Sequence, residues 1–345
     1  MAGRRPQPIN RVGSDGTRWK DMQDMPIDRR PACLAAVLAA IVALVGGSAQ
    51  ALAQDKLKIA AGQRGNWDSS VPEIMQRMGF AKKHGLELEI QWTQGAGETQ
   101  QAVISNSVDI GVAPGVMGVL SAFAKGAPVR VIGNQASGAQ DLYWYVKADS
   151  PIRSWADTDG RTLAFSTNSS STHGIVTAFM SEKKLKARPV ATGGPPATLT
   201  QVMSGQIDIG WAAPPFGLDQ LDKGEIRVLG KGSDTAFGGQ TLRFNIVNTQ
   251  TLSAKKDQIT RFIRAYRETV AAMYTDDGLK VYADWLKIDL AKAKRTRDDF
   301  FPRDSIEPDR IIGLDAIVAE AFNLKYTLEP LSKAKLDELI QIPPQ

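Results

Sequence analysis

The chain has 345 residues and a net charge of +5, but residues 1–53 hold seven of its 42 Lys and Arg and four of its 37 Asp and Glu, which leaves the remainder at +2. A charge this small and dispersed excludes the clustered basic surface of a nucleic-acid-binding protein. The single cysteine, Cys33, also lies in the N-terminal segment, which excludes disulfides, thiolate metal sites and a cysteine nucleophile from residues 54–345.

The N-terminal segment has the pattern of a secretory signal peptide. A pair of arginines precedes an apolar stretch of about a dozen residues, and the sequence A-L-A at residues 51–53 forms a small-x-small cleavage site. The apolar stretch is shorter than the roughly 20 residues of a membrane-spanning helix. We expect residues 1–53 to be removed, with Met25 as a candidate true start and Gln54 as the first residue of a periplasmic protein.

The first part of the mature chain predicts strands that alternate with helices. In chain order, the strands are "KLKIAAG", "LELEIQWTQ", "VDIGVAP" and "PVRVIGNQ", and the helices between them are "VPEIMQRMGFAKKHG", "GAGETQQAVISNS" and "GVMGVLSAFAKG". Gly85 is the expected C-terminal cap of the first helix. This alternation favours βαβ units and a parallel sheet.

The pattern then repeats. "DLYWYVKADS" and "RTLAF" read as strands, and "TLTQVMSGQIDIGWAAP" matches "TQQAVISNSVDIGVAP" at an offset of 99 residues, so Asp109 corresponds to Asp208. We expect both aspartates to orient backbone groups. The repeat predicts two lobes with the same internal connections, the first from residues 54–140 and 241–345 and the second from residues 141–240, joined by ordered strands.

The C-terminal part is predicted to be mainly helical. The segment "KKDQITRFIRAYRETVAAMY" places apolar residues at the i, i+3, i+4 spacing of a half-buried helix, namely Ile259, Phe262, Ile263, Tyr266 and Val270. Two or three shorter helices are expected to follow it.

Five motifs in this order resemble the substrate-binding proteins of nitrate/sulfonate/taurine ABC importers. They are "KIAAGQRGNW", "GAGETQQAVISNSVDIGVAPG", "YWYVKADSPI", "STNSSSTHG" and "MSGQIDIGWAAPP", and they span nearly the whole mature chain. The resemblance implies a two-lobed α/β protein with the type II periplasmic binding fold, each lobe a mainly parallel sheet flanked by helices. It also implies a ligand in the cleft between the lobes and delivery of that ligand to a membrane permease.

The stretch "FSTNSSSTHG" lies between a predicted strand and a predicted helix. Unpaired N–H groups and the positive end of the helix dipole make such a position suitable for an anion. Short hydroxyl side chains let the anion approach the backbone and add donors. The candidate ligand residues here are Thr167, Ser169, Ser170, Ser171, Thr172 and His173. The alternative is capping of the helix alone, for which one hydroxyl suffices.

Further candidates follow the strands that are expected to end at the cleft. Asn66 and Trp67 come after the first strand, where the family places a ligand loop, although a tryptophan can equally pack in the core. The remaining candidates end the two D-I-G strands, and they are Pro114, Gly115, Trp211 and Pro214.

These features predict a solute receptor rather than an enzyme. The expected ligand is a small organic anion, either sulfonate or taurine-like or a carboxylate, since two tryptophans near the cleft favour an organic anion over nitrate. We expect no catalytic residues, cofactor or metal, an ABC permease as partner, and a monomer. The alternative is an enzyme on the same fold that resembles pyrimidine synthases, but those depend on a site with histidine and cysteine.

Overall fold

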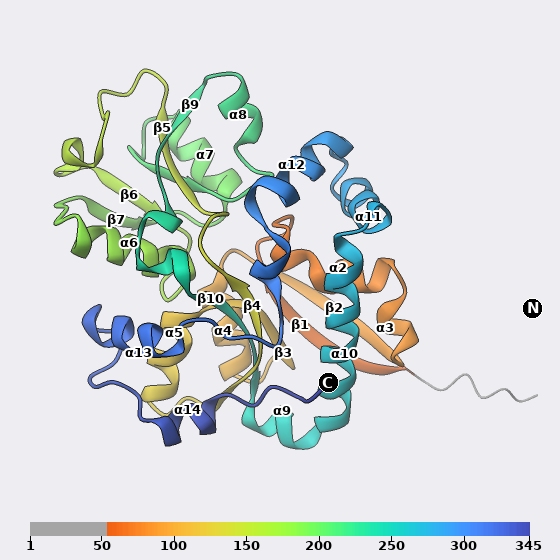
Figure 1. Ribbon diagram of the computed structural model, residues 1–345. Coiled ribbons are helices and arrows are strands. Elements are labelled where there is room, and N and C mark those ends of the chain that lie inside the picture. The colour runs from red at the N-terminus through yellow and green to blue at the C-terminus, as the bar shows by residue number, and fades with distance from the viewer. Residues whose placement is uncertain (1–53) are drawn as a thin grey trace, which may run out of the picture. The chain divides into compact units, whose positions relative to one another are not determined.

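The structure is a computed structural model that describes residues 54–345 (Figure 1). The predicted signal segment and its cleavage site lie outside the described residues. Within that range, no helix is long and apolar enough to cross a membrane.

A five-stranded sheet forms the first lobe. Its order is β2-β1-β3-β10-β4. The strands are β1 (Asp55–Gly62), β2 (Leu86–Thr93), β3 (Ile110–Gly115), β4 (Val129–Ser137) and β10 (Thr241–Asn248). β1 pairs in parallel with β2 and β3, whereas β10 runs antiparallel to both β3 and β4. The sheet is therefore mixed, because the chain inserts β10 on its return from the second lobe.

Four helices connect the strands of this sheet: α2 (Val71–Arg77), α3 (Phe80–Lys83), α4 (Ala96–Ile104) and α5 (Val116–Ala124). The single helix expected over residues 71–85 is interrupted, because Gly79 adopts a left-handed φ of 79° between α2 and α3. The expected cap at Gly85 is confirmed by its φ of 68° directly after the C-cap residue His84.

The second lobe contains a three-stranded sheet in the order β8-β5-β9 and the parallel pair β6-β7. Its strands are β5 (Tyr143–Lys147), β6 (Thr162–Phe165), β7 (Arg188–Ala191), β8 (Gly210–Ala212) and β9 (Ile226–Lys231), and its helices are α6 (Ser171–Glu182), α7 (Pro195–Met203) and α8 (Leu218–Asp222). A parallel bridge between Leu163 and Ile209 places β6 beside the start of β8.

The bridge gives the second lobe the order β7-β6-β8-β5-β9, which repeats that of the first lobe strand for strand. In each lobe the antiparallel strand is the one that follows the crossing from the other lobe, β10 in the first sheet and β5 in the second. Buried threonine pairs repeat as well: the hydroxyls of Thr93 and Thr99 lie 2.7 Å apart, and so do those of Thr192 and Thr198. The internal repeat seen in the sequence is therefore a repeat of structure.

The two matched aspartates have the backbone role expected of them. Asp109 accepts from the N–H of Lys58 over 2.8 Å, and Asp208 accepts from the N–H of Thr162 over the same distance. Each carboxylate thus fixes the start of its own D-I-G strand to the neighbouring strand.

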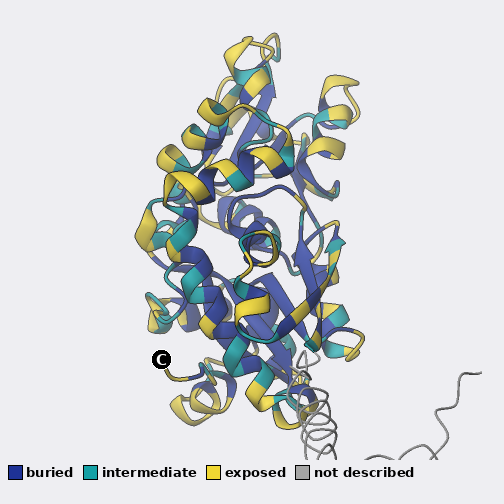
Figure 2. Cartoon of the chain, turned by 90° about the vertical axis from the view of Figure 1, so that its right-hand side faces the viewer, coloured by how far each residue is buried: buried dark blue, intermediate teal, exposed yellow. Residues whose placement is uncertain are grey.

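The C-terminal part is helical, with α9 (Thr249–Ala254), α10 (Lys256–Met273), α11 (Asp276–Leu286), α12 (Leu290–Phe300), α13 (Leu314–Asn323) and α14 (Lys333–Leu339). Short 3-10 helices complete the described chain: η3 (Asp68–Ser70), η4 (Trp155–Thr158), η5 (Gly232–Asp234), η6 (Ala236–Gly239) and η7 (Arg303–Ile306). The five apolar residues predicted to face the core in α10 are all fully buried. Figure 2 shows the same division of helices into a buried and an exposed face.

The two-lobed α/β architecture expected from the sequence is confirmed, with helices flanking both sheets (Figure 1). Residues 54–345 form one compact unit. The lobe boundaries at residues 140 and 240 consequently stay a prediction.

Candidate functional site

The hydroxyl-rich turn connects β6 to α6. Ser170 is the N-cap, and its Oγ accepts from the N–H of His173 over 3.1 Å. Thr172 Oγ1 accepts from the N–H of Ser166 over 2.9 Å and lies 2.9 Å from Ser170 Oγ. Several hydroxyls of this turn therefore stabilise the turn itself. Capping accounts for Ser170.

A small cavity lies where this turn meets the first lobe. Its volume is about 20 Å³, which is enough for roughly one water molecule. Residues from both lobes line it: Gly62, Gln63, Asn66, Ser69, Ala96, Ala113, Leu142, Ser166, Ser171, Thr172, Trp211 and Arg243. The lobes are thus closed around the cavity, and a larger solute requires a wider cleft.

Four of the twelve candidates from the sequence line this cavity, namely Asn66, Ser171, Thr172 and Trp211. Five further candidates lie at the contact between the lobes or in the turn around it, namely Gly115, Thr167, Ser169, Ser170 and His173. Pro114 is the penultimate residue of β3. Pro214 precedes Pro215 through a cis peptide bond. A direct role in ligand binding stays a prediction for all twelve.

Trp67 does not line the cavity. Its ring packs edge-on against the rings of Tyr282 and Tyr274, with centroid distances of 4.7 and 5.9 Å. Core packing, which was the alternative for this tryptophan, accounts for its position in this conformation.

His173 is held within the turn rather than presented to the cavity. Its Nδ1 accepts from the N–H of Ser169 over 3.2 Å and lies 3.3 Å from the hydroxyl of Tyr326. The ring stacks on Phe165. Burial lowers the pKa of His173, which favours a neutral ring.

Glycines of the first lobe allow the turn to approach very closely. A Cβ at Gly97 would lie 2.1 Å from the carbonyl oxygen of Asn168, and one at Gly115 would lie 2.4 Å from the nitrogen of Ser171. The N–H of Gly97 also donates to Thr167 Oγ1 over 3.1 Å. Closure of the lobes therefore depends on the absence of side chains here, a role that the sequence "GAGE" did not reveal.

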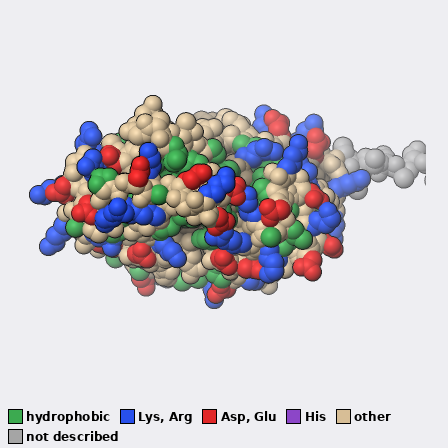
Figure 3. Space-filling model, turned by 90° about the horizontal axis from the view of Figure 1, so that it is seen from above, with side chains coloured by type: hydrophobic (Ala, Val, Ile, Leu, Met, Phe, Trp, Pro, Cys, Tyr) green, Lys and Arg blue, Asp and Glu red, His purple; other side chains and the backbone are tan. Residues whose placement is uncertain are grey.

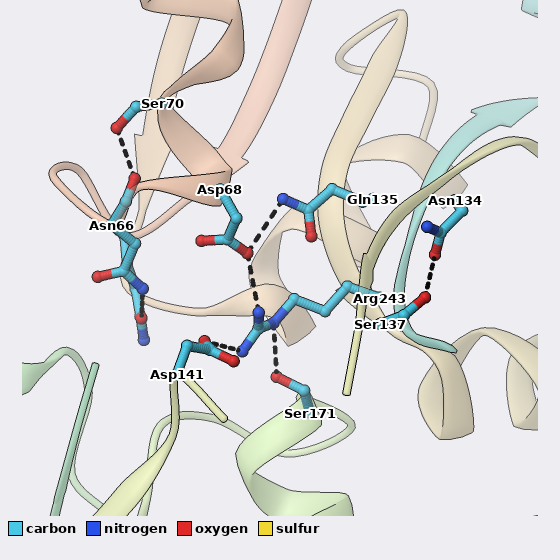
Figure 4. A network of polar contacts seen from close by, with 10 residues as sticks. Asn66, Asp68, Ser70, Asn134, Gln135, Ser137, Asp141, Ser171 and Arg243 are labelled. Carbon is cyan, nitrogen blue, oxygen red and sulfur yellow. Dashed lines mark hydrogen bonds and ion pairs between the residues drawn. The ribbon is translucent and has the colours of Figure 1, made fainter. Parts of the chain in front are cut away.

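A buried ion-pair network centred on Arg243 lies beside the cavity (Figure 4). Its Nη1 donates to Asp68 over 2.8 Å, its Nη2 to Asp141 over 2.7 Å, and its Nε to Ser171 over 3.2 Å. Gln135 donates to the same oxygen of Asp68 over 3.0 Å. Arg243 comes from β10, Asp141 from the connection between β4 and β5, and Ser171 from α6, so the network joins the lobes.

Arg243, Asp68 and Asp141 were not singled out in the sequence. The available signal was weak: Arg243 is the one charged residue in the strand "TLRFNIVN". A charged residue in a fully buried strand requires partners, because an unpaired buried charge is very unfavourable. The partners themselves are far away in the sequence.

Burial sets the electrostatics of this network. It raises the pKa of Asp141 from 3.8 to about 6, and the neighbouring charge of Asp68 adds to the rise, while Arg243 opposes it. Burial alone would lower the pKa of Arg243, but the two carboxylates raise it further above its ordinary value. The guanidinium is therefore permanently charged and shared between two acids.

Unpartnered polar atoms belong to residues that line the cavity or to the adjoining Arg243 network. Among the described residues, Asn66 Oδ1, Asp68 Oδ1 and Trp211 Nε1 are buried without a hydrogen-bond partner. The N–H groups of Ser171 and Thr172, in the first turn of α6, have no acceptor among the hydrogen bonds of the described chain. Buried polar atoms are normally paired, so these groups offer both donors and acceptors to a ligand.

Ion pairs also connect α12 to the second lobe. Lys292 lies 2.5 Å from Asp219, and Arg295 Nη1 donates to both oxygens of Asp222 over 2.8 Å. The face seen in Figure 3 carries acidic and basic side chains intermixed. The exposed ion pairs between α12 and the second lobe each contribute little to stability, but they favour the closed arrangement of the lobes.

No group of three or more His, Cys, Asp and Glu within residues 54–345 is arranged to hold a metal ion. His84, the other histidine, pairs with Glu268 over 3.1 Å and does not line the cavity.

Comparison with known proteins supports the resemblance drawn from the motifs. The family model described as NMT1/THI5 like matches residues 74–278. No curated protein matches the chain.

Solved structures share the fold. The alkanesulfonate-binding protein SsuA from Xanthomonas axonopodis pv. citri, bound to MOPS, is 16% identical with a TM-score of 0.68 over 84% of this chain and 99% of that protein. A Candida albicans protein with the generic periplasmic binding protein fold is 16% identical with a TM-score of 0.67 over 84% of this chain and 98% of that protein. The periplasmic nitrate-binding protein NrtA from Synechocystis PCC 6803 is 12% identical with a TM-score of 0.65 over 84% of this chain and 86% of that protein. At these identities the likeness shows the fold, which is that of the periplasmic binding proteins and confirms the fold class expected from the sequence.

Proposed function

Because the chain belongs to the NMT1/THI5-like family, we propose that it is a periplasmic solute-binding protein that delivers a small organic anion, sulfonate or taurine-like or a carboxylate, to the permease of an ABC importer. It acts as a monomer after removal of residues 1–53. The structural neighbours that are sulfonate-binding and nitrate-binding proteins support this class of function.

One observation carries the proposal most directly. The cavity between the lobes is lined by the first turn of α6, where the N–H groups of Ser171 and Thr172 are unpaired, and by Trp211, whose Nε1 has no partner. A helix N-terminus with free donors favours a negative group. The buried indole N–H supplies a third donor, so an anionic group of the solute has three donors within one enclosed site.

The enzyme alternative is less well supported by the same residues. Neither His84 nor His173 lines the cavity, and cysteine is absent from residues 54–345. A site of the histidine and cysteine type that the alternative requires is therefore not assembled there.

A thermal-shift screen of residues 54–345 with sulfonates, carboxylates and inorganic anions tests the proposal. A true ligand at a hundredfold excess over its Kd stabilises the protein by about 2.7 kcal/mol, which raises Tm by several degrees. We expect one organic class to do so and to be recovered chemically unchanged. Conversion of the compound would instead support an enzyme, and a screen without any hit would refute the small organic anion as ligand.

A further inference from the structure

The charges around the cavity do not balance. Arg243, Asp68 and Asp141 are all at least 95% buried, and together they bring one positive and two negative charges into the closed site. Each nitrogen of the Arg243 guanidinium already donates to one of Asp68, Asp141 and Ser171. Its charge is thus offset, and a solute anion placed beside it would also meet two carboxylates.

Acceptors are in excess on the first-lobe side. Asp68 Oδ1 and Asn66 Oδ1 have no donor among the described residues, and Asn66 is 4% exposed and lines the cavity. In Figure 4 the free oxygen of Asp68 points toward Asn66, on the same side of the guanidinium. Unpaired buried acceptors cost free energy, and only a donor can satisfy them.

The donors lie on the opposite side. They are the unpaired N–H groups of Ser171 and Thr172 and the indole N–H of Trp211, all from the second lobe. The closed site thus has unpaired acceptors at Asn66 and Asp68 in the first lobe, and unpaired donors at the start of α6 and at Trp211 in the second.

We propose that the solute carries a protonated nitrogen, an ammonium or amidinium group, which binds between Asn66 and Asp68 while its anionic group binds the start of α6. This rests on the proposed function and narrows the ligand from organic anions in general to zwitterions. A positive group at this place offsets the second carboxylate, so it stabilises the closed site where a simple anion does not. The lobes separate further than in this structure to admit it, since the present cavity has room for about one water molecule.

Matched triplets of small compounds test the proposal on the wild-type protein. Each triplet has a zwitterion, the same anion without nitrogen, and the amine without the acid: 2-aminoethanesulfonate, ethanesulfonate and ethylamine; 4-aminobutanoate, butanoate and butylamine; and 4-(aminomethyl)benzoate, 4-methylbenzoate and benzylamine. Titration calorimetry measures each Kd. We expect the zwitterion of at least one triplet to bind at least tenfold more tightly than its nitrogen-free anion.

Equal or tighter binding of the nitrogen-free anions overturns this inference but leaves the proposed function standing. A complete lack of binding across the triplets overturns the inference too, and the broader screen of sulfonates, carboxylates and inorganic anions then decides the proposed function separately.

The variant Asp68→Asn tests whether Asp68 causes the preference for the zwitterion over the nitrogen-free anion. It keeps the shape of the side chain but removes one negative charge, so the zwitterion should bind about tenfold to a hundredfold more weakly while the nitrogen-free anion binds no worse. Asp309→Asn is the control, because Asp309 also pairs with an arginine, Arg267, but is not part of the Arg243 network beside the cavity. An unchanged zwitterion preference in Asp68→Asn contradicts the proposal, and if that variant fails to fold, the wild-type triplets still decide it.

Discussion

Arg243 Nη2 donates to Asp141 over 2.7 Å and thereby ties a central strand of the first sheet to the connection that leads into the second. The same guanidinium holds Asp68 in the first lobe. A single side chain therefore neutralises part of the charge that lobe closure buries and connects three separate segments.

Replacing Arg243 with alanine should destabilise the protein strongly. It leaves two buried carboxylates without a counter-charge, and breaking a buried pair in this way costs about 3–5 kcal/mol. Chemical denaturation measures the loss. Adding Asp68→Asn and Asp141→Asn to the Arg243→Ala variant should restore part of it, because the unpaired charges are then gone. A single variant as stable as the wild type would show that the network is not a structural element.

Closure should depend on Gly97. In Gly97→Ala the new methyl group would meet the carbonyl oxygen of Asn168 at 2.1 Å, so the lobes cannot close as they do here. Alanine is a better helix former than glycine, so the substitution should not destabilise α4 itself. We expect a larger radius of gyration in solution scattering and weaker solute binding.

The control for this variant is Gly174→Ala, another glycine near the start of a helix. Its added Cβ would lie 3.4 Å or more from its neighbours, which is ordinary contact. The two variants should differ in scattering and in affinity. Identical profiles for both would count against the close approach at Gly97.

Asp141 should make stability depend on pH. Burial raises its pKa from 3.8 to about 6 in the folded chain. The stability that the protonated carboxyl contributes is therefore fully present below pH 3.8 and is lost as the pH rises through 6. Arg243 and Asp68 are the charged groups that face it. The free energy of unfolding at pH 5 minus that at pH 7 should be larger in the wild type than in Asp141→Asn. The same difference in both proteins would rule out this assignment, and Asp309→Asn serves as the control.

The mature protein is predicted to begin near Gln54. Mass spectrometry of material exported to a bacterial periplasm measures this directly. Retention of the arginine pair at residues 29 and 30 would refute both the cleavage site and the soluble periplasmic form.

Local patterns predicted much of the fold. Three predicted features are present in the structure: the apolar spacing in α10, the cap at Gly85 and the 99-residue repeat. Each of them depends only on residues within one or two neighbouring helices or strands. The repeat also predicted the backbone role of Asp109 and Asp208, since corresponding residues of a repeated unit meet the same surroundings.

The candidate site could be predicted only in part. The turn before α6 was visible because its hydroxyls are consecutive in the sequence. Arg243 was not, because its partners Asp68 and Asp141 lie 175 and 102 residues away and no local pattern connects them. The sequence shows that Trp67 follows the first strand, but the direction of its ring is set by contacts with Tyr274 and Tyr282, more than 200 residues later.

The structure separates two neighbouring serines that the sequence could not distinguish. Ser170 caps α6, whereas Ser171 lines the cavity and accepts from Arg243. Ser170→Ala should lower stability by about 1 kcal/mol, as the loss of an N-cap usually does. It should leave affinity for a solute nearly unchanged.

The most direct test of a solute site in this cavity is the calorimetric Kd of Ser171→Ala for the strongest ligand from the screen, compared with wild type and with Ser170→Ala. Ser171 Oγ accepts from Arg243, which leaves its O–H free to donate to the anionic group of the solute. Removal of one such hydrogen bond to a charged group is worth about 1.5–3 kcal/mol, so Ser171→Ala should bind about tenfold to a hundredfold more weakly, with its fold retained. A Kd for Ser171→Ala equal to that of the wild type would contradict the account and place the ligand elsewhere.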